Sequence, residues 1–285
     1  MKLLVGIGEG IGNFIMATPL IEALGRIAVN NTPTDVIFTA NYPEAAELLQ
    51  GWERIGKISP NPNEFDLYSY HRILITPWFG LPQTFFGMGN VMVANGNLLR
   101  LTSEVEVNMD LARILGYKGE TPPYHVEYNK NRDFSMYKGC VGFHNGANPR
   151  WPFKRWPYFP QLAEKFERVV LVGSLQDRQD GWPSNVHNFQ GLLPLRDTAA
   201  LMRACDFFVT NDSGLMHLAV ALGVKTYAIF GPTSQKKNLP KGVMPISKGL
   251  ECQPCQHTNR WGFCNSLECM VGLSPDEVYE QIQNG

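Results

Sequence analysis

The sequence predicts an α/β protein with two doubly wound domains, each built around a parallel β-sheet. Three observations predict it: short apolar runs alternate with segments of helical periodicity, this alternation occurs twice, and residues 119–138 between the two sets contain a Pro-Pro pair and have weak periodicity. We therefore place the domains at residues 1–125 and 138–272, with a terminal helix over residues 273–285. Ligands of such folds bind beyond the carboxyl ends of the strands, so we expect the two domains to face a central cleft.

Each element of the first domain is predicted from an apolar run or from apolar residues at helical spacing. The predicted strands cover residues 2–6, 35–39 and 72–75, and the predicted helices cover residues 13–26, 43–50 and 104–115. Pro19 lies inside the first helix and predicts a kink or a late start, because proline lacks the N–H that a helix interior uses. The aromatic-rich segment 78–86 either shapes a ligand site or packs against the sheet.

The second domain repeats the alternation of strands and helices. The predicted strands cover residues 140–143, 169–172, 207–209 and 226–230, and the predicted helices cover residues 158–166, 198–204, 214–222 and 275–283. Asp212 and Ser213 directly precede the third helix, and we expect their side-chain oxygens to accept its first N–H groups. Gly214 leaves the backbone accessible there. A helix that begins at the carboxyl end of a strand favours an anion, so we expect a phosphate-bearing ligand at this turn.

Alternating glycines follow the first predicted strand, in the sequence Gly-Ile-Gly-Glu-Gly-Ile-Gly-Asn over residues 6–13. A dinucleotide-binding fingerprint needs glycines at relative positions one, three and six, and here Ile11 or Asn13 occupies the last position. The turn therefore does not support NAD or FAD binding. The glycines still allow a ligand to approach the backbone closely, and the alternative is a tight turn without a ligand.

Two segments of the second domain carry polar or cationic residues near a strand end. The first contains His144, Asn145 and Gly146, and the second contains Lys154 and Arg155 just before a predicted helix. A lysine point charge and an arginine fork together suit a diphosphate. The alternative is a solvated basic turn.

Four of the six cysteines lie close together near the carboxyl end, as Cys252, Cys255, Cys264 and Cys269. Their separations of two, eight and four residues are compatible with a structural zinc site. The alternative is a loop whose thiols are free or reversibly oxidised.

The bulk composition argues against several classes of protein. The formal net charge of -1 gives no support for broad electrostatic binding to nucleic acid or to an anionic membrane. The start of the chain lacks the long apolar core of a signal peptide, and no run of about 18 apolar residues predicts a membrane span. We therefore expect a cytoplasmic protein without a membrane span and without a nucleic-acid partner.

Short motifs occur in a fixed order along nearly the whole chain. They are Gly-Asn-Phe-Ile-Met-Ala-Thr-Pro at 12–19, Lys-Arg-Trp-Pro at 154–157, Leu-Val-Gly-Ser at 171–174, Asn-Asp-Ser-Gly-Leu-Met-His-Leu-Ala at 211–219, Phe-Gly-Pro-Thr at 230–233, Cys-Gln-Pro-Cys at 252–255 and Leu-Ser-Pro-Asp-Glu-Val at 273–278. This ordered set resembles glycosyltransferase family 9, the ADP-heptose:lipopolysaccharide heptosyltransferases and their relatives. The motifs at 211–219 and 154–157 are the most specific.

The resemblance implies a GT-B fold, in which the first of two Rossmann-like domains binds the acceptor and the second binds the nucleotide sugar. It implies an inverting, metal-independent glycosyltransferase that moves a heptose or similar sugar from an ADP-, UDP- or GDP-linked donor to an acceptor hydroxyl. The default acceptor is a lipopolysaccharide or another glycan. The resemblance implies no cofactor for this chemistry.

The resemblance also implies roles for single residues of the second domain. Lys154 would contact the phosphates or the sugar of the donor, and Asp212 would contact sugar hydroxyls or hold the loop. Ser213 and Gly214 would line the diphosphate site, and His217 would stabilise this region. The expected donor-binding residues are His144, Asn145, Gly146, Lys154, Arg155, Gly173, Asp212, Ser213, Gly214, Leu215 and His217.

Two positions depart from the pattern of the family. Where the family carries an aspartate as the proposed general base, this chain has Asn13, whose amide cannot take the acceptor proton. Glu9 on the same loop is the nearest substitute, so the predicted catalytic residues are Glu9, Asn13 and Lys154. The family also leads us to expect an acidic residue after residues 173–174, and Asp177 only neighbours that position.

Other functions stay open at this point. Asn13 favours a catalytically inactive nucleotide-sugar-binding protein of the same fold as the second hypothesis. A third hypothesis makes the cysteine cluster a zinc module for protein or nucleic-acid contact. Within the leading hypothesis, the acceptor is either a glycan or another hydroxyl compound such as a modified nucleobase.

Overall fold

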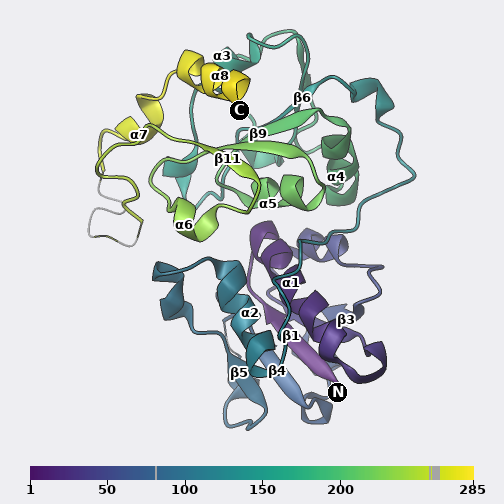
Figure 1. Ribbon diagram of the computed structural model, residues 1–285. Coiled ribbons are helices and arrows are strands. Elements are labelled where there is room, and N and C mark those ends of the chain that lie inside the picture. The colour runs from purple at the N-terminus through teal and green to yellow at the C-terminus, as the bar shows by residue number, and fades with distance from the viewer. Residues whose placement is uncertain (81, 257, 259–263) are drawn as a thin grey trace. The chain divides into compact units, whose positions relative to one another are not determined.

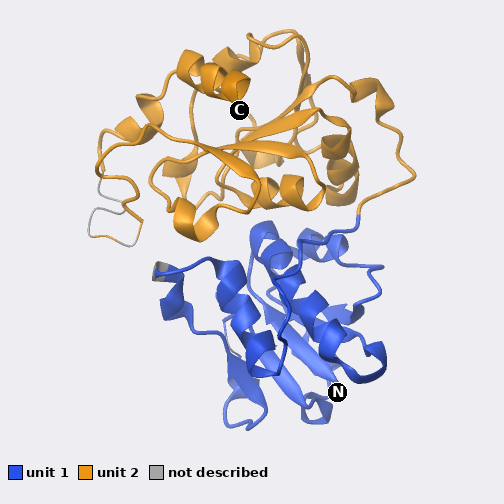
Figure 2. Ribbon diagram, viewed as in Figure 1, with its two compact units in different colours: residues 1–127 blue, residues 128–285 orange. Residues whose placement is uncertain are grey.

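The structure is a computed structural model that describes residues 1–285 except 81, 257 and 259–263. The described chain forms two compact units, which we call unit 1 (Met1–Glu127) and unit 2 (Tyr128–Gly285), shown in Figure 2. Each unit has its own parallel β-sheet (Figure 1).

Unit 1 is built on a parallel sheet with the strand order β3-β2-β1-β4-β5. Its strands and α-helices are β1 (Leu3–Ile7), α1 (Ile11–Ile27), β2 (Thr34–Phe38), β3 (Ile55–Ser59), β4 (Arg72–Ile75), β5 (Val91–Val93) and α2 (Glu104–Ile114). The strand order reverses between β1 and β4. In a doubly wound sheet, the crevice that takes a ligand opens outside the carboxyl ends of the two strands at this switch point.

Different structures cover the two faces of the unit 1 sheet. Leu3, Val5 and Ile7 of β1 contribute to a core that α1 and α2 complete, whereas Leu4 points to the opposite face, as alternate residues of a strand do. Figure 1 shows α1 and α2, which pack against each other, lying over the sheet. The opposite face is covered by aromatic side chains from loops and short 3₁₀ segments, namely Phe65, Tyr70, Phe79 and Phe85.

Helix α1 continues through Pro19 and begins at Ile11, so the helix does not start late. The hydroxyl of Thr18 donates to the carbonyl oxygen of Ile15 at 2.7 Å. This is the oxygen that an N–H at position 19 would reach one turn back, so Thr18 supplies the donor that proline lacks. The same hydroxyl accepts from the backbone N–H of His125 at 3.0 Å, which ties the end of unit 1 to α1.

Unit 2 is built on a parallel sheet with the strand order β11-β10-β9-β6-β7-β8, whose switch point lies between β6 and β9. Its strands are β6 (Val141–His144), β7 (Val169–Leu171), β8 (Val186–Asn188), β9 (Phe207–Asn211), β10 (Lys225–Ile229) and β11 (Val243–Ile246). Its α-helices are α3 (Phe159–Ala163), α4 (Leu195–Ala204), α5 (Gly214–Ala221), α6 (Gln235–Asn238), α7 (Glu268–Val271) and α8 (Pro275–Asn284).

Helices cover both faces of the unit 2 sheet (Figure 1). On one face, α3 and α8 bring Phe159 and Val278 into a core with the strands. On the other face, Met216 of α5 packs with Ala228 of β10, and α4 lies beside α5. Both faces are therefore buried, and the polar ends of the strands are the place to look for a ligand site.

The predicted elements occur with small shifts at their ends, and two of them differ in kind or length. The helix predicted over residues 43–50 is a 3₁₀ helix, η2 (Pro43–Leu48), and α3 is shorter than the helix predicted over residues 158–166. Strands β3, β5, β8 and β11, which are the edge strands of the two sheets, were not predicted from the sequence. These strands are partly exposed, and each is short or interrupted: β5 and β8 have three residues each, β3 carries Lys57, and β11 contains Pro245.

Among the described residues, none of the helices combines the length and the apolar composition that crossing a bilayer requires.

Candidate functional site

The loops at the switch point of unit 2 are held together by Asn211, the last residue of β9. Its side-chain amide donates to the backbone carbonyls of Asn145 at 2.9 Å and Gly146 at 3.2 Å. Its side-chain oxygen accepts from the backbone N–H of Trp156 at 3.1 Å. Asn211 therefore joins the loop after β6 to the Lys-Arg-Trp-Pro motif and to the start of α5. Asn211 belongs to the motif at 211–219, but its role as a bridge was not predicted from the sequence.

Lys154 and Asp212 form an ion pair at this edge of the sheet, in which the aspartate is buried and the lysine is half-buried. The Nζ of Lys154 lies 3.0 Å from an oxygen of the Asp212 carboxylate, and the side-chain amide of Asn238 donates to the same carboxylate at 2.8 Å. Burial alone would raise the pKa of Asp212, but the charge of Lys154 and the hydrogen bonds lower it below the ordinary value. The carboxylate is thus charged and paired.

Ser213 occupies the N-cap position of α5, but its side chain does not cap the helix. Its hydroxyl lies 3.1 Å from Nδ1 of His144 and 3.3 Å from the hydroxyl of Thr210. The predicted capping role of Ser213 is therefore wrong, because its hydroxyl has other partners on β6 and β9. The carboxylate of Asp212, which was expected to cap as well, is paired with Lys154 and Asn238. The first turn of α5 has no acidic side chain, and the carboxylate of Asp212 just before it is paired with Lys154.

Asp177, which the sequence analysis set aside as a neighbour, lies at the centre of a second polar cluster. Its carboxylate lies 2.9 Å from Nη2 of Arg155 and 3.7 Å from Nε2 of His144. Burial alone would raise the pKa of Asp177, but the interaction with His144 and the hydrogen bonds from Ser174 lower it to about 2. A Cβ at Gly146 would lie 2.3 Å from this carboxylate, so the cluster requires glycine there.

Ser174 and Asp177 form a reciprocal capping box, with Ser174 N–H donating to the Asp177 carboxylate at 2.9 Å. The Ser-x-x-Asp spacing was the signal that would have placed Asp177 at the start of a helical turn. Gly173, directly before it, has a φ of 149°, and a Cβ there would lie 3.2 Å from both Asp177 and His144.

His217 is buried on α5, one turn from Ser213. Burial lowers its pKa to about 4, so the imidazole is neutral near pH 7. Leu215 is also buried. The predicted site residues of unit 2 thus gather at one edge of its sheet: His144, Asn145, Gly146, Lys154, Arg155, Gly173, Asp212, Ser213, Gly214, Leu215 and His217.

In unit 1, Glu9 lies in the glycine turn that leads into α1, and Asn13 lies in the first turn of that helix. The amide of Asn13 donates to the backbone carbonyl of Glu9 at 2.7 Å, and the Glu9 carboxylate accepts from the amide of Asn41 at 2.6 Å. Gly10 precedes α1 with a φ of 101°, a conformation that favours glycine. The two predicted catalytic residues of unit 1 are therefore adjacent, and their chemical roles stay predictions.

The predicted zinc site is not supported. Cys252 and Cys264 are exposed and Cys269 is buried. Across the part of the chain that the structure describes, His, Cys, Asp and Glu side chains form no group of three or more that could hold a metal ion.

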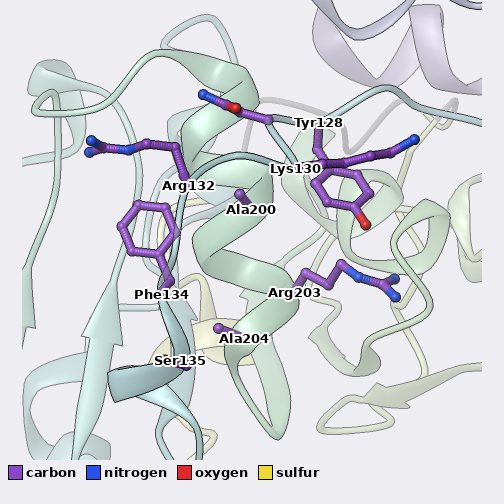
Figure 3. A pocket seen from close by; sticks show the side chains of 9 residues that line it. Tyr128, Lys130, Arg132, Phe134, Ser135, Ala200, Arg203 and Ala204 are labelled. Carbon is purple, nitrogen blue, oxygen red and sulfur yellow. The ribbon is translucent and has the colours of Figure 1, made fainter.

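A hollow of about 240 Å³ lies elsewhere on unit 2, between residues 128–135 and α4 (Figure 3). Two of the cations that line it are engaged. Arg132 lies 3.2 Å from Asp197, and Arg203 donates to the carbonyl of Leu222 at 3.0 Å. The hollow contains none of the predicted site residues, and we assign it no part in the site.

Comparison with known proteins places this chain in one family. The profile of glycosyltransferase family 9 (heptosyltransferase) matches residues 100–261, more than half of the chain. Lipopolysaccharide heptosyltransferase 2 of Salmonella typhimurium is 36% identical over 53% of this chain and 49% of that protein. Lipooligosaccharide heptosyltransferase 2 of Campylobacter jejuni is 30% identical over 49% of this chain and 50% of that protein. The chain spans about half the length of the curated relatives it matches.

Solved structures resemble the chain over almost its whole length. The structure of Escherichia coli ADP-heptose lps heptosyltransferase II has a TM-score of 0.72 and 20% identity, covering 100% of this chain and 98% of that chain. A glycosyl transferase family 9 protein from Veillonella parvula has a TM-score of 0.74 and 15% identity, covering 99% of this chain and 96% of that chain. These likenesses confirm the predicted GT-B class, with two Rossmann-like α/β units. With the profile match over more than half its length, the chain belongs to glycosyltransferase family 9.

Proposed function

We propose that the chain is a glycosyltransferase that moves a sugar from a nucleoside-diphosphate donor, bound on unit 2, to an acceptor hydroxyl bound on unit 1. The observation that carries the proposal is the Lys154–Asp212 pair beside the uncapped start of α5. By analogy with the heptosyltransferases it resembles, the default sugar is a heptose and the default acceptor is a lipopolysaccharide core. The cytoplasmic location expected from the sequence stays a prediction.

The diphosphate would bind where the backbone N–H groups at Ser213 and Gly214 meet the ammonium of Lys154. Helix N–H groups and a lysine together suit a diphosphate, because both donate hydrogen bonds and both carry positive charge. In the reaction, the acceptor oxygen bonds to the anomeric carbon from the face opposite the leaving group. The bond from that carbon to the phosphate oxygen breaks, and its electron pair leaves on the diphosphate, where these positive groups stabilise it.

Asp212 would have two tasks in this site. Without a donor it keeps the ammonium of Lys154 paired, at 3.0 Å. With a donor, its carboxylate can accept hydrogen bonds from sugar hydroxyls while Lys154 turns toward the phosphates. This exchange avoids leaving a buried charge without a partner at either stage.

His144, Arg155 and Asp177 would act behind the diphosphate site. His144 holds the hydroxyl of Ser213 at 3.1 Å and in turn lies beside the Asp177 carboxylate. Because Arg155 also pairs with Asp177, the loop after β6 is fixed by charge as well as by hydrogen bonds. These residues would therefore position the donor loop in advance of binding.

The acceptor proton would pass to Glu9, the carboxylate nearest to Asn13 on the glycine turn. Asn13 cannot act as a base, but its amide holds the carbonyl of Glu9 at 2.7 Å and so fixes the turn. Replacing Glu9 by Gln keeps the shape and removes the base, so turnover should fall by at least about 100-fold. The matched control is Asn41→Ala, which removes the 2.6 Å partner of Glu9 but leaves the base in place.

The proposal is tested by acceptor-dependent release of nucleoside diphosphate. Purified protein is mixed with ADP-, UDP- and GDP-sugars and with panels of glycan and non-glycan acceptors, and the released diphosphate is measured. We expect release with one donor class, only when an acceptor is present. Failure to release any diphosphate, together with failure to bind any donor by calorimetry, would overturn the proposal.

Asn13 favours a second candidate, a nucleotide-sugar-binding protein without transferase activity. That candidate predicts donor binding by calorimetry and no turnover with any acceptor. Turnover by the wild-type chain that is lost in Glu9→Gln would exclude it. Turnover that appears only in Asn13→Asp would favour it, because a carboxylate would then restore the missing base.

A further inference from the structure

Trp78 lies at the switch point of unit 1. β1 and β4 pair in parallel, and the N–H of Thr76, directly after β4, donates to the carbonyl of Gly6 at 2.9 Å. The crevice of a doubly wound sheet opens outside these two strand ends. Trp78 is two residues beyond Thr76 and lies against the glycine turn that leads to Asn13.

The backbone of Trp78 is held in an unusual conformation. Its φ of 68° lies in the left-handed region, which a bulky residue rarely adopts because its Cβ crowds the backbone. Gly8 packs directly against it, since a Cβ added at Gly8 would lie 2.6 Å from the carbonyl carbon of Trp78. Strain of this kind persists only where the surroundings enforce it, and it concentrates at binding sites.

The side chain of Trp78 is anchored at one edge and exposed elsewhere. The indole N–H donates to the carboxylate of Glu104 at 2.9 Å. Glu104 is 3% exposed, whereas Trp78 is 55% exposed. Phe79 and Phe85 of the same segment are buried in the core, so packing against the sheet accounts for those rings and not for Trp78. The ring is thus fixed in direction while much of its surface meets solvent.

We propose that Trp78 is the platform on which a pyranose ring of the acceptor stacks. This inference rests on the proposed function and names the chemistry that recognises the acceptor. One face of a pyranose presents C–H groups. When this face stacks on the indole, apolar surface of both rings is removed from water. A ring that is already anchored by Glu104 loses little conformational freedom on binding.

The position of Trp78 favours the acceptor over the donor as the source of the sugar. The donor diphosphate is proposed on unit 2, whereas Trp78 adjoins the turn of unit 1 that carries Glu9, the proposed base. A sugar stacked on Trp78 would bring its hydroxyls to the same strand ends as that turn. If the stacked sugar belongs to the acceptor, substitution of Trp78 changes the KM of the acceptor. If it belongs to the donor, the KM of the donor changes instead.

The experiment compares Trp78→Ala and Trp78→Phe with the wild-type chain, and uses Tyr68→Ala as the matched control. Tyr68 is an exposed aromatic residue of unit 1 that lies before β4, at the other end of that strand. The KM for a core oligosaccharide acceptor should rise about tenfold in Trp78→Ala and less in Trp78→Phe, by analogy with the loss of one stacked ring. In both Trp78 variants, the KM for the donor should stay that of the wild type. The control Tyr68→Ala should keep the melting behaviour of the wild type.

A direct measurement does not depend on turnover. The indole N–H signal of Trp78, assigned from its loss in Trp78→Phe, should shift on titration with a phosphate-free core oligosaccharide. If the wild-type chain releases no diphosphate but this signal shifts, the proposed function fails and the platform stands. If diphosphate is released while Trp78→Ala keeps the acceptor KM of the wild type, the platform is refuted and the function stands. A rise in the donor KM alone also refutes it.

The variant Trp78→Gly separates recognition from folding. Glycine adopts a positive φ without strain, so Trp78→Gly should unfold at the same temperature as Trp78→Ala or higher, the reverse of the usual order. A well-folded Trp78→Gly chain with a raised acceptor KM supports the platform. A Trp78→Gly chain with the acceptor KM of the wild type shows that Trp78 is only structural.

Discussion

Unit 1 and unit 2 have the same kind of switch point, but they hold the loops at that point in different ways. In unit 2, charged pairs such as Lys154–Asp212 and Arg155–Asp177 fix the loops from both sides. In unit 1, a glycine turn packs against the strained backbone of Trp78. The family profile begins at residue 100 and so includes little of unit 1. In this GT-B protein, ion pairs therefore fix the loops at the switch point of one unit, and close backbone packing fixes those of the other.

The largest test of this comparison removes a charge from unit 2. Lys154→Ala leaves the buried carboxylate of Asp212 without its cation, so the free energy of unfolding should fall by about 3–5 kcal/mol. Turnover should fall by about 100- to 1000-fold, because the leaving diphosphate loses its ammonium. Urea unfolding and steady-state kinetics measure the two effects.

The double variant Lys154→Met, Asp212→Asn is the control for this change. It removes both charges, so it should recover most of the lost stability and none of the lost turnover. If Lys154→Ala is as stable as the wild type, the pair does not fix the loop and the comparison between the units fails.

The second test uses pH, because His217 of unit 2 is buried in its neutral form. Its pKa is about 4 in the folded chain against 6.5 for an ordinary histidine, so the unfolded chain takes up the proton first as pH falls. Stability is therefore complete above about pH 6.5 and decreases by about 3 kcal/mol as pH falls to 4. The free energy of unfolding of His217→Gln should not show this decrease between pH 6.5 and 4. Unfolding is followed by the fluorescence of the buried Trp156.

Asp177 should affect the free energy of unfolding only at lower pH, below the range in which His217 takes up its proton. Its pKa is lowered to about 2 from 3.8, so its contribution to stability is present above pH 3.8 and is lost as pH falls toward 2. Equal acid sensitivity of the wild type and His217→Gln between pH 6.5 and 4 would show that another group is responsible.

The smallest expected effects come from adding one methyl group to each switch point. In Gly146→Ala, the new Cβ would lie 2.3 Å from the Asp177 carboxylate and should lower donor affinity about tenfold by parting Asp177 from Arg155. In Gly8→Ala, the Cβ would press on Trp78 and should raise the acceptor KM by a few fold, with donor affinity unchanged.

The matched control for both is Gly80→Ala. A Cβ at Gly80 meets nothing within 4 Å, and its φ is not positive, so neither substrate should be affected. Calorimetry with the donor and acceptor kinetics distinguish the two units. A loss of donor affinity in Gly8→Ala would break the assignment of donor to one unit and acceptor to the other.

The central elements of the fold were predictable, because their strands are buried runs of apolar residues. β7 and β9 are of this kind, whereas β8 (Val186–Asn188) carries His187 and Asn188 and has no pattern that separates it from a loop. Edge strands gain most of their order from the neighbouring strand, a contact that is absent from the linear sequence.

The candidate site was predictable where a single segment carries it, and less so where distant segments meet. The motifs around Lys154 and Asp212 stand out in the sequence, but their 3.0 Å contact arises only when β9 folds beside β6. The cap expected from Ser213 failed for the same reason, since His144 comes from another strand and takes the hydroxyl. The position of Asp177 along the chain does not show that its carboxylate meets His144 and Arg155, because both come from other segments of the fold.

The glycine at position 146 also constrains how this chain can diverge. Because any side chain there would overlap the carboxylate of Asp177, a substitution at 146 depends on which residue stands at 177. An alanine at 146 fits without displacing that carboxylate only after position 177 has shortened, for instance to serine, so a shortening at 177 should precede the alanine. Among descendants of this sequence, pairs with a larger residue at 146 and an intact acid at 177 should therefore be rare.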